Sequence, residues 1–463
     1  MLQTVNYRDK ITLFSVLLSG TLLLCWAAFY NGFPLIYSDT STYLESGFTL
    51  ETPLDRPIMY GILLRIFSLN GTTVWGIILA QTFLLTSLIY LTVRSLSVNR
   101  KSAMQKTAAV TGILALLSGL PWLTSELIAD IFSPICVLVF YLILFSDNAG
   151  RKLKVLLYVI LILSLACHIS NVLIVLALTA CVSLISFFRK RKGKAVRVHR
   201  RDLILISVSA LLALSTMGAS ISKSRHVFMM GHLIETGILN AYLDDHCATQ
   251  DISFCKYRDR IPPGAETFIW NSDGDSVLIL TGGWLGSREE YSGIISETFS
   301  TPKYLRMHVT AAISGTLRQL VAIRVGEGMG AYDPSLTVSR RLKQYFPGEY
   351  NQYLASRQSK DEMGSFPVID PINGSATAIS LLVLATWFFT GRKKSVMKSP
   401  LTILVTTLAG AYFLNCAICA SLATVANRFG ARFSWMAIMV AVLLIADMIR
   451  NNRKKTALNT ISN

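Results

Sequence analysis

Residues 155–188 read VLLYVILILSLACHISNVLIVLALTACVSLISFF, and the division of this apolar run decides the fold predicted for the whole chain. The run is too long for one transmembrane helix, which needs roughly 20 apolar residues. His168, Ser170 and Asn171 interrupt it near the middle. We therefore expect two spans, 155–168 and 170–188, that form a hairpin.

The composition is that of a membrane protein. Of the 463 residues, 52% are hydrophobic and 15% are charged, whereas soluble domains carry about 25% charged residues. The mean hydropathy is +0.49. The predicted fold class is an all-α polytopic membrane protein. Its ten expected spans are 11–30, 72–93, 107–124, 127–146, 155–168, 170–188, 203–221, 376–391, 399–421 and 432–449.

The positive charge of the loops supports the division of the 155–188 run. With the N-terminus inside, the inner segments carry 25 of the 44 Lys and Arg residues; they are 1–10, 94–106, 147–154, 189–202, 392–398 and 450–463. Merging the run into one span would place the basic sequence GRKKSVMK (391–398) outside, against the positive-inside rule. The net charge of +17 is therefore a topology signal, and we expect no nucleic-acid partner.

The spans divide the chain into three regions. We expect a transmembrane module at 1–221 with a first outer loop at 31–71, an extracytoplasmic region of mixed or α structure at 222–375, and C-terminal transmembrane helices at 376–463. Cys247 and Cys255 lie in the extracytoplasmic region. Because that location is oxidising, we expect them to form a structural disulfide.

Two further helices are expected outside the spans. The segment 57–67, with arginines near both ends, is typical of a short helix lying at the membrane interface. The segment 302–325 has apolar residues at helical spacing. This second helix either lies on the membrane surface or packs on the extracytoplasmic region.

Polar side chains collect at the outer ends of the predicted spans. Acids, a histidine and arginines at one membrane face suit an anionic lipid-phosphate ligand, because charge at membrane depth is usually functional. The candidate site residues are Asp39, Tyr43, Arg56, Glu126, Asp130, His168, His232, Arg428 and Arg432. Structural alternatives stay open for several of them: Asp39 can cap a helix, and Arg56 can form an interfacial salt bridge with Asp55. His168 can be a hydrogen-bonded residue at a helix break, and the last two arginines can be interfacial anchors that snorkel.

Several chemistries lack their sequence signatures. The chain contains no GxxxxGK[ST], HExxH, GxSxG or dinucleotide-binding motif. We expect no tightly bound cofactor and no metal site built from the histidines, while the sequence leaves a metal requirement open.

Four segments carry a family resemblance: SDTSTYL (38–44), DRPIMYGILL (55–64), PWLTSELIAD (121–130) and NRFGARFSW (427–435). In this order they resemble the integral-membrane glycosyltransferases of the GT-C fold class. The resemblance implies a polyprenyl-phosphate sugar as co-substrate and the bacterial inner membrane as location, and the loop charges predict that both termini are cytoplasmic. It also implies an inverting hexosyl or pentosyl transfer to an envelope glycan, lipid or protein, with Asp39 as general base and arginines on the phosphate.

Two other classes of function stay open at this point. A lipid or glycan transporter would also have intramembrane charges and many spans, although the sequence shows no inverted repeat. A non-catalytic assembly subunit would use the extracytoplasmic region to bind a partner.

Overall fold

The computed structural model describes residues 7–146, 149–193, 198–271, 273–363, 368–390 and 399–462. Within these residues the chain is helical and has no β-strand. Six helices are long and apolar enough to cross a membrane: α5 (Trp75–Ser95), α10 (Ile169–Arg191), α11 (Arg200–Glu235), α21 (Ile369–Thr390), α22 (Pro400–Leu422) and α23 (Asn427–Ser462). By the length and composition of its helices, the chain is an all-α membrane protein.

Helices also lie at the other four expected spans. They are α1 (Tyr7–Leu24), which α2 (Trp26–Asn31) follows, α6 (Arg100–Leu117), α8 (Phe132–Phe145) and α9 (Arg151–Cys167). Of these, α8 is buried along nearly its whole length, as expected for a helix that is apolar on every side and lies at the centre of a bundle. That all ten helices cross the membrane stays a prediction.

The division of the 155–188 run is confirmed. His168 separates α9 from α10 and has an extended backbone, with φ −154° and ψ 132°. Its Nδ1 accepts a hydrogen bond from the backbone N–H of Ser170, at 3.2 Å. The histidine thus caps the second helix of the hairpin, which satisfies one of the free N–H groups at the helix start.

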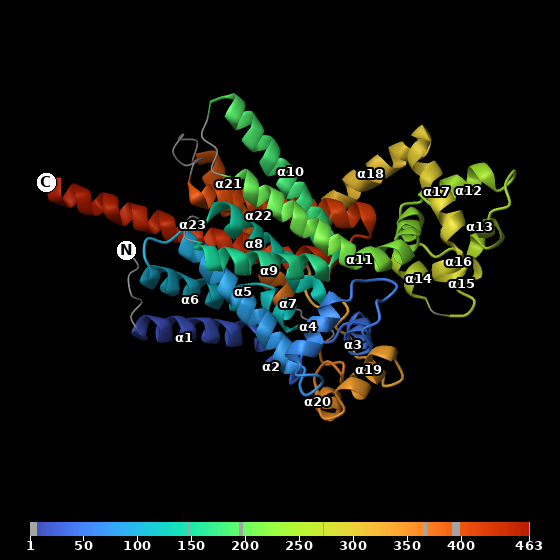
Figure 1. The fold of residues 1–463 in the computed structure, drawn as a ribbon, viewed down its shortest axis with the longest axis horizontal. Coiled ribbons are helices and arrows are strands. Elements are labelled where there is room, and N and C mark those ends of the chain that lie inside the picture. The colour runs from blue at the N-terminus through green and yellow to red at the C-terminus, as the bar shows by residue number, and fades with distance from the viewer. Residues whose placement is uncertain are drawn as a thin grey trace.

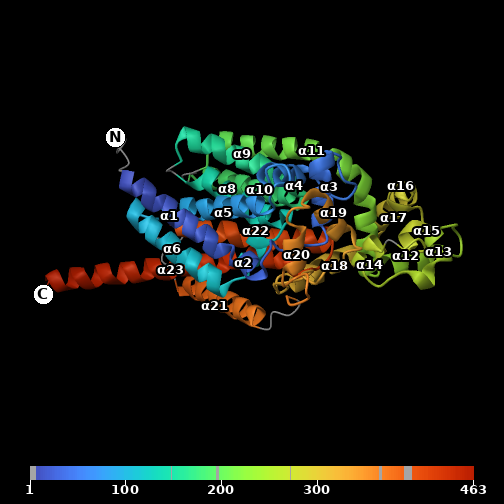
Figure 2. The same ribbon diagram turned by 90° about the horizontal axis from the view of Figure 1, so that it is seen from below.

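The two ends of the molecule differ in what they contain. Figures 1 and 2 show both chain termini at one end of the helix bundle and the inserted region at the other. Helix α11 connects the two parts, because it continues without a break past the expected boundary at 221 to Glu235. Its 36 residues span roughly 54 Å, against about 30 Å for a bilayer core.

The first part of the inserted region forms a lobe with its own core. The lobe contains α12 (Ile238–His246), α13 (Ser253–Lys256), η2 (Arg258–Arg260), α14 (Ala265–Trp270), α15 (Val277–Leu280), α16 (Gly283–Gly286) and α17 (Arg288–Ser300). Phe254, Phe268 and Tyr291 pack together in its core. The expected disulfide between Cys247 and Cys255 is present.

Helix α18 (Pro302–Gln319) packs against both the lobe and the bundle. Tyr304 enters the core of the lobe, and the hydroxyl of Tyr412 in α22 donates to the backbone oxygen of Leu320, at 2.8 Å. The helix still leaves an apolar stripe exposed along its length, formed by Leu305, Val309, Ile313 and Leu317, and Val321 continues the stripe just after the helix ends. It is shorter than the expected 302–325.

The last part of the inserted region belongs to the bundle. Helix α19 (Thr337–Tyr345) packs on α3 (Thr40–Thr49), and α20 (Tyr350–Ala355) follows it. Leu342 and Phe346 join the main core of the protein. The structure therefore divides the expected 222–375 region between a separate lobe and a cover over the first outer loop.

Helix α4 (Met59–Phe67) falls at the expected interfacial helix and packs closely on α3. The two helices meet at Gly47 and Gly61. A Cβ atom on Gly61 would lie 2.6 Å from the backbone oxygen of Tyr43. This contact between backbones fixes the position of the loop that carries Asp39 and Arg56. The remaining short helices are α7 (Leu120–Ser125) and η1 (Ala129–Ile131).

Candidate active site

A cavity of about 840 Å³ lies between the bundle and the lobe. Its wall is formed by the first outer loop, by α10, α11, α22 and the start of α23, and by the lobe helices α14 and α17. Five of the candidate residues line it: Asp39, Tyr43, Arg56, His168 and Arg428. Segments far apart in the sequence therefore bring an acid, a histidine and two arginines to one cavity.

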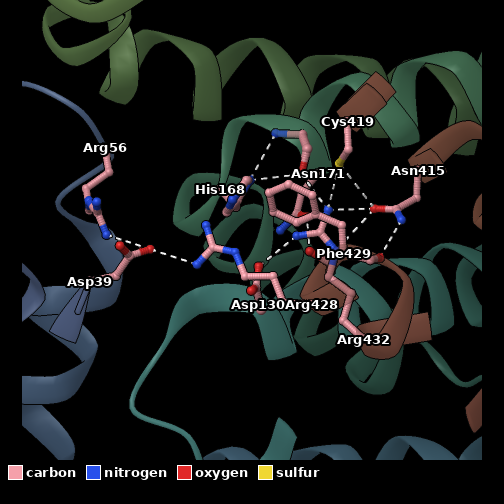
Figure 3. A network of polar contacts seen from close by, with 12 residues as sticks. Asp39, Arg56, Asp130, His168, Asn171, Asn415, Cys419, Arg428, Phe429 and Arg432 are labelled. Atoms are coloured by element: carbon pink, nitrogen blue, oxygen red, sulfur yellow. Dashed lines mark hydrogen bonds and ion pairs between the residues drawn. The ribbon is translucent and has the colours of Figure 1, made fainter. Parts of the chain in front are cut away.

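Asp39 is held between two arginines (Figure 3). Its Oδ2 lies 2.9 Å from Nη1 of Arg56 and 3.1 Å from Nη1 of Arg428. Asp39 occupies the position before the first residue of α3, but its side chain makes no capping hydrogen bond. The side chain thus serves the ion pairs and not the helix start.

The two arginines decide the protonation state of Asp39. Burial alone would raise the pKa of the carboxyl group, but the charges of Arg56 and Arg428 outweigh burial and lower the pKa to about 2. Asp39 is therefore ionised at neutral pH, and it is a weak base as long as both arginines contact it.

Aromatic rings hold both guanidinium groups in place. The Arg56 guanidinium lies 5.3 Å from the ring centre of Tyr43 and 5.8 Å from that of Trp270, and the Arg428 guanidinium lies 4.8 Å from the ring centre of Tyr37. Such contacts favour a cation. Nη1 of Arg56 is buried, and its geometry toward Asp39 is not that of a hydrogen bond; within the described residues it has no hydrogen-bond partner. This nitrogen can donate to a ligand.

Arg432 lies one helical turn deeper than Arg428 and has a different role. It is fully buried, and its Nη1 lies 2.7 Å from Oδ1 of Asp130. Its Nε also donates to Oδ1 of Asn415, at 3.1 Å, and its Nη2 to the same oxygen, at 2.5 Å. Figure 3 shows this network of polar contacts. The structure therefore does not bring Arg432 and Asp130 to the wall of the large cavity, where we expected them to bind phosphate.

Glu126 faces a second, much smaller cavity of about 20 Å³, which Asp130, Glu327, Arg428 and Arg432 also line. Burial, followed by the charge of Asp130, raises the pKa of the Glu126 carboxyl group to about 8. Glu126 thus shares a cavity with Arg428 but does not line the cavity that contains Asp39.

The two candidate histidines have different surroundings. Nδ1 of His168 binds Ser170, which leaves Nε2 available to a ligand in the cavity. His232 does not line the large cavity. It is 3% exposed. Its Nδ1 lies 3.3 Å from the backbone oxygen of Ala423, and its ring stacks on that of His308. The structure thus places His232 in the packing between helices.

Sequence reasoning missed the residues that the lobe adds to the cavity wall. They are Glu266 and Trp270 from α14, and Ser292, Ile295 and Ser296 from α17. Their spacing of three or four residues is only a weak sequence signal for a shared helix face, because it can be recognised only once α14 and α17 are known to be helices. Among the described residues, no group of three His, Cys, Asp or Glu side chains is placed to hold a metal ion.

Comparison of the chain with models of protein families, with curated proteins and with solved structures found no match. The function has to be inferred from the chemistry of the cavity.

Proposed function

We propose that this protein is a membrane glycosyltransferase that moves a monosaccharide from a polyprenyl-phosphate donor to an acceptor of the cell envelope. The observation that supports this best is the convergence of Arg56 and Arg428 on Asp39 at the wall of a cavity large enough for a substrate. In this proposal the cavity faces the extracytoplasmic side, and the termini, at the opposite end of the bundle, are cytoplasmic.

The cavity suits a donor that is both charged and lipidic. An arginine side chain binds phosphate through paired N–H donors, which lysine cannot match. Apolar side chains from three bundle helices line the same cavity: Ile169, Leu173, Ile221, Ile418 and Leu422. The phosphate would bind at the two arginines, and the first isoprene units would lie against this apolar wall.

Donor binding would also activate the base. In the free protein Asp39 is neutralised by two guanidinium groups. A donor phosphate competes for those groups, and each contact that Asp39 loses raises the pKa of its carboxyl group toward the ordinary value. The acid thus becomes an effective base only when the donor is present.

The transfer step then needs one base and charge neutralisation. The acceptor hydroxyl gives its proton to Asp39, and its oxygen attacks the anomeric carbon. The bond from that carbon to the phosphate oxygen breaks, and the electron pair stays on the phosphate, which the arginines stabilise. Attack from the side opposite the phosphate inverts the anomeric centre. General-base assistance of this kind contributes about 10²- to 10⁴-fold to the rate.

The proposal is tested with the full chain in lipid nanodiscs. Polyprenyl-phosphate-linked monosaccharides are titrated for binding and then followed for product with a mixture of envelope acceptors. Asp39→Asn should keep donor binding within a few-fold and lose at least about 100-fold in turnover. Asp251→Asn, at an exposed site in the lobe, is the matched control and should behave as the wild type.

Three results would refute the proposal. Product formation by Asp39→Asn at the wild-type rate would exclude this residue as the base. Movement of the lipid across a vesicle membrane without a new glycosidic bond would indicate a transporter. If the wild-type protein binds none of the donors, the remaining candidate function is that of a non-catalytic assembly subunit.

A further inference from the structure

The lobe side of the large cavity differs from the bundle side in its chemistry. Here, where α11 meets the lobe, the wall combines Trp270 and the apolar side chains of Phe228, Met229 and Ile295 with a set of hydrogen-bonding groups. Trp270 is 48% exposed although it is among the bulkiest side chains. The groups around it are Ser220, Ser224, Arg225, Glu266, Ser292 and Ser296.

Helical periodicity brings these groups to the cavity. Glu266 and Trp270 are four residues apart on α14, and Ser292 and Ser296 are four residues apart on α17. Residues at this spacing lie on the same face of a helix. Each lobe helix thus turns one face toward the cavity, and both faces carry polar groups.

The polar groups of this wall have capacity left for a ligand. Within the described part of the chain, the carboxylate of Glu266 and the guanidinium of Arg225 form no hydrogen bond or ion pair. Glu266 nevertheless lies close enough to Tyr37 to act on its hydroxyl through charge, so its carboxylate is near the residues that surround Asp39. A ligand rich in hydroxyl groups would satisfy such a wall.

The indole of Trp270 is fixed by its neighbours. Phe228 and Trp284 contact it, with ring centres 6.0 and 5.9 Å away. The Arg56 guanidinium lies 5.8 Å from the ring centre, and this arginine also contacts Asp39. The ring is therefore a platform packed against the arginine that contacts the proposed base.

We propose that this wall is the acceptor subsite and that the acceptor is a carbohydrate. A pyranose ring has an apolar face of C–H groups, which stacks on an indole, and hydroxyl groups at its rim. Glu266, Ser292 and Ser296 would hold those hydroxyls and direct one of them to Asp39. A peptide would instead need partners for its backbone amides, and a lipid would leave the polar groups unpaired. The transfer to this acceptor rests on the proposed function, whereas sugar binding does not.

The test measures sugar binding separately from catalysis. The full chain in nanodiscs is applied to a printed array of oligosaccharides together with peptides containing Ser and Thr. We expect the wild type to bind a subset of the oligosaccharides. Trp270→Ala should weaken that binding at least tenfold, which corresponds to about 1.4 kcal/mol, because the variant loses both the stacking contact and the area that the indole buries.

Two matched controls separate the subsite from general effects on the lobe. Glu266→Gln should also weaken binding, whereas Glu289→Gln, an exposed residue of α17 outside the cavity wall, should not. Leu285→Ala is the control for Trp270→Ala. It also removes a large apolar side chain of the lobe, one that is 63% exposed and lies outside the cavity wall, and it should bind like the wild type.

The outcomes distinguish this inference from the proposed function. If Trp270→Ala binds oligosaccharides as tightly as the wild type does, the acceptor subsite is overturned even if the donor is consumed. The same holds if the wild-type protein binds only peptides on the array. Loss of oligosaccharide binding in Trp270→Ala supports the subsite even if no donor binds, in which case only the transferase proposal fails. In an active preparation, Trp270→Ala should raise the KM for the acceptor more than the KM for the donor, which the lost contact between Trp270 and Arg56 also affects.

Discussion

Replacement of Glu126 by glutamine should remove a large part of the pH dependence of stability. Glu126 is half-buried beside Asp130 and Glu327, and Arg428 is the neighbour that favours its charge. Its pKa rises from the ordinary 4.5 to about 8 in the folded protein. Between these two values the folded state keeps a proton that the unfolded state has lost.

The sign and size of the effect follow from this difference. Because the folded state binds more protons, the free energy of unfolding falls as the pH rises from 4.5 toward 8. Each pKa unit corresponds to about 1.4 kcal/mol, so the loss is about 3–5 kcal/mol across this range. Glutamine has no proton to lose. The variant should therefore match the wild type near pH 4.5 and exceed its stability by several kcal/mol at pH 8.

Equilibrium unfolding in mixed micelles, followed by circular dichroism at pH 5, 6.5 and 8, measures this difference. Glu289→Gln, at an exposed position, is the control for the loss of one charge and should follow the wild type. If Glu126→Gln and the wild type lose stability in parallel as the pH rises, the carboxyl group is not protonated in the folded protein and the reasoning is wrong.

Two further predictions concern packing. Asp130→Leu alone should destabilise the protein by about 3–5 kcal/mol, because it leaves the buried charge of Arg432 without its ion-pair partner. Addition of Arg432→Met should recover most of that loss in the same unfolding assay. A double variant as unstable as the single one would contradict the ion-pair explanation. Gly61→Ala should destabilise by about 1–3 kcal/mol, because its Cβ would collide with the backbone of α3. Gly112→Ala, in open space on α6, should instead stabilise by up to about 1 kcal/mol, so equal effects at both glycines would refute this explanation.

The positions of the helices could be predicted from the sequence because apolar runs and loop charge are local signals. The break at His168 is the clearest case, because His168, Ser170 and Asn171 interrupt a long apolar run where the structure has two helices. The gathering of Asp39, Arg56 and Arg428 was also within reach, because all three follow or precede predicted spans on the same side.

The roles of individual side chains depended on depth and packing, which the sequence does not show. Arg428 and Arg432 are one turn apart and look equivalent, yet one reaches the cavity and the other is buried with Asp130. Trp270 reaches the cavity only because α14 folds back against α11. No local pattern predicts such a long-range contact.

The apolar stripe on α18 has a practical consequence for dissecting this protein. A fragment cut at residues 222 and 375 would keep that exposed stripe and would also uncover the surface of α18 that now packs on α22. It would also carry α19 away from the helix it covers. Such a fragment should aggregate when it is produced alone. A shorter fragment that ends after α17 keeps the disulfide and most of the lobe core, and it is the better choice for secreted expression and crystallisation.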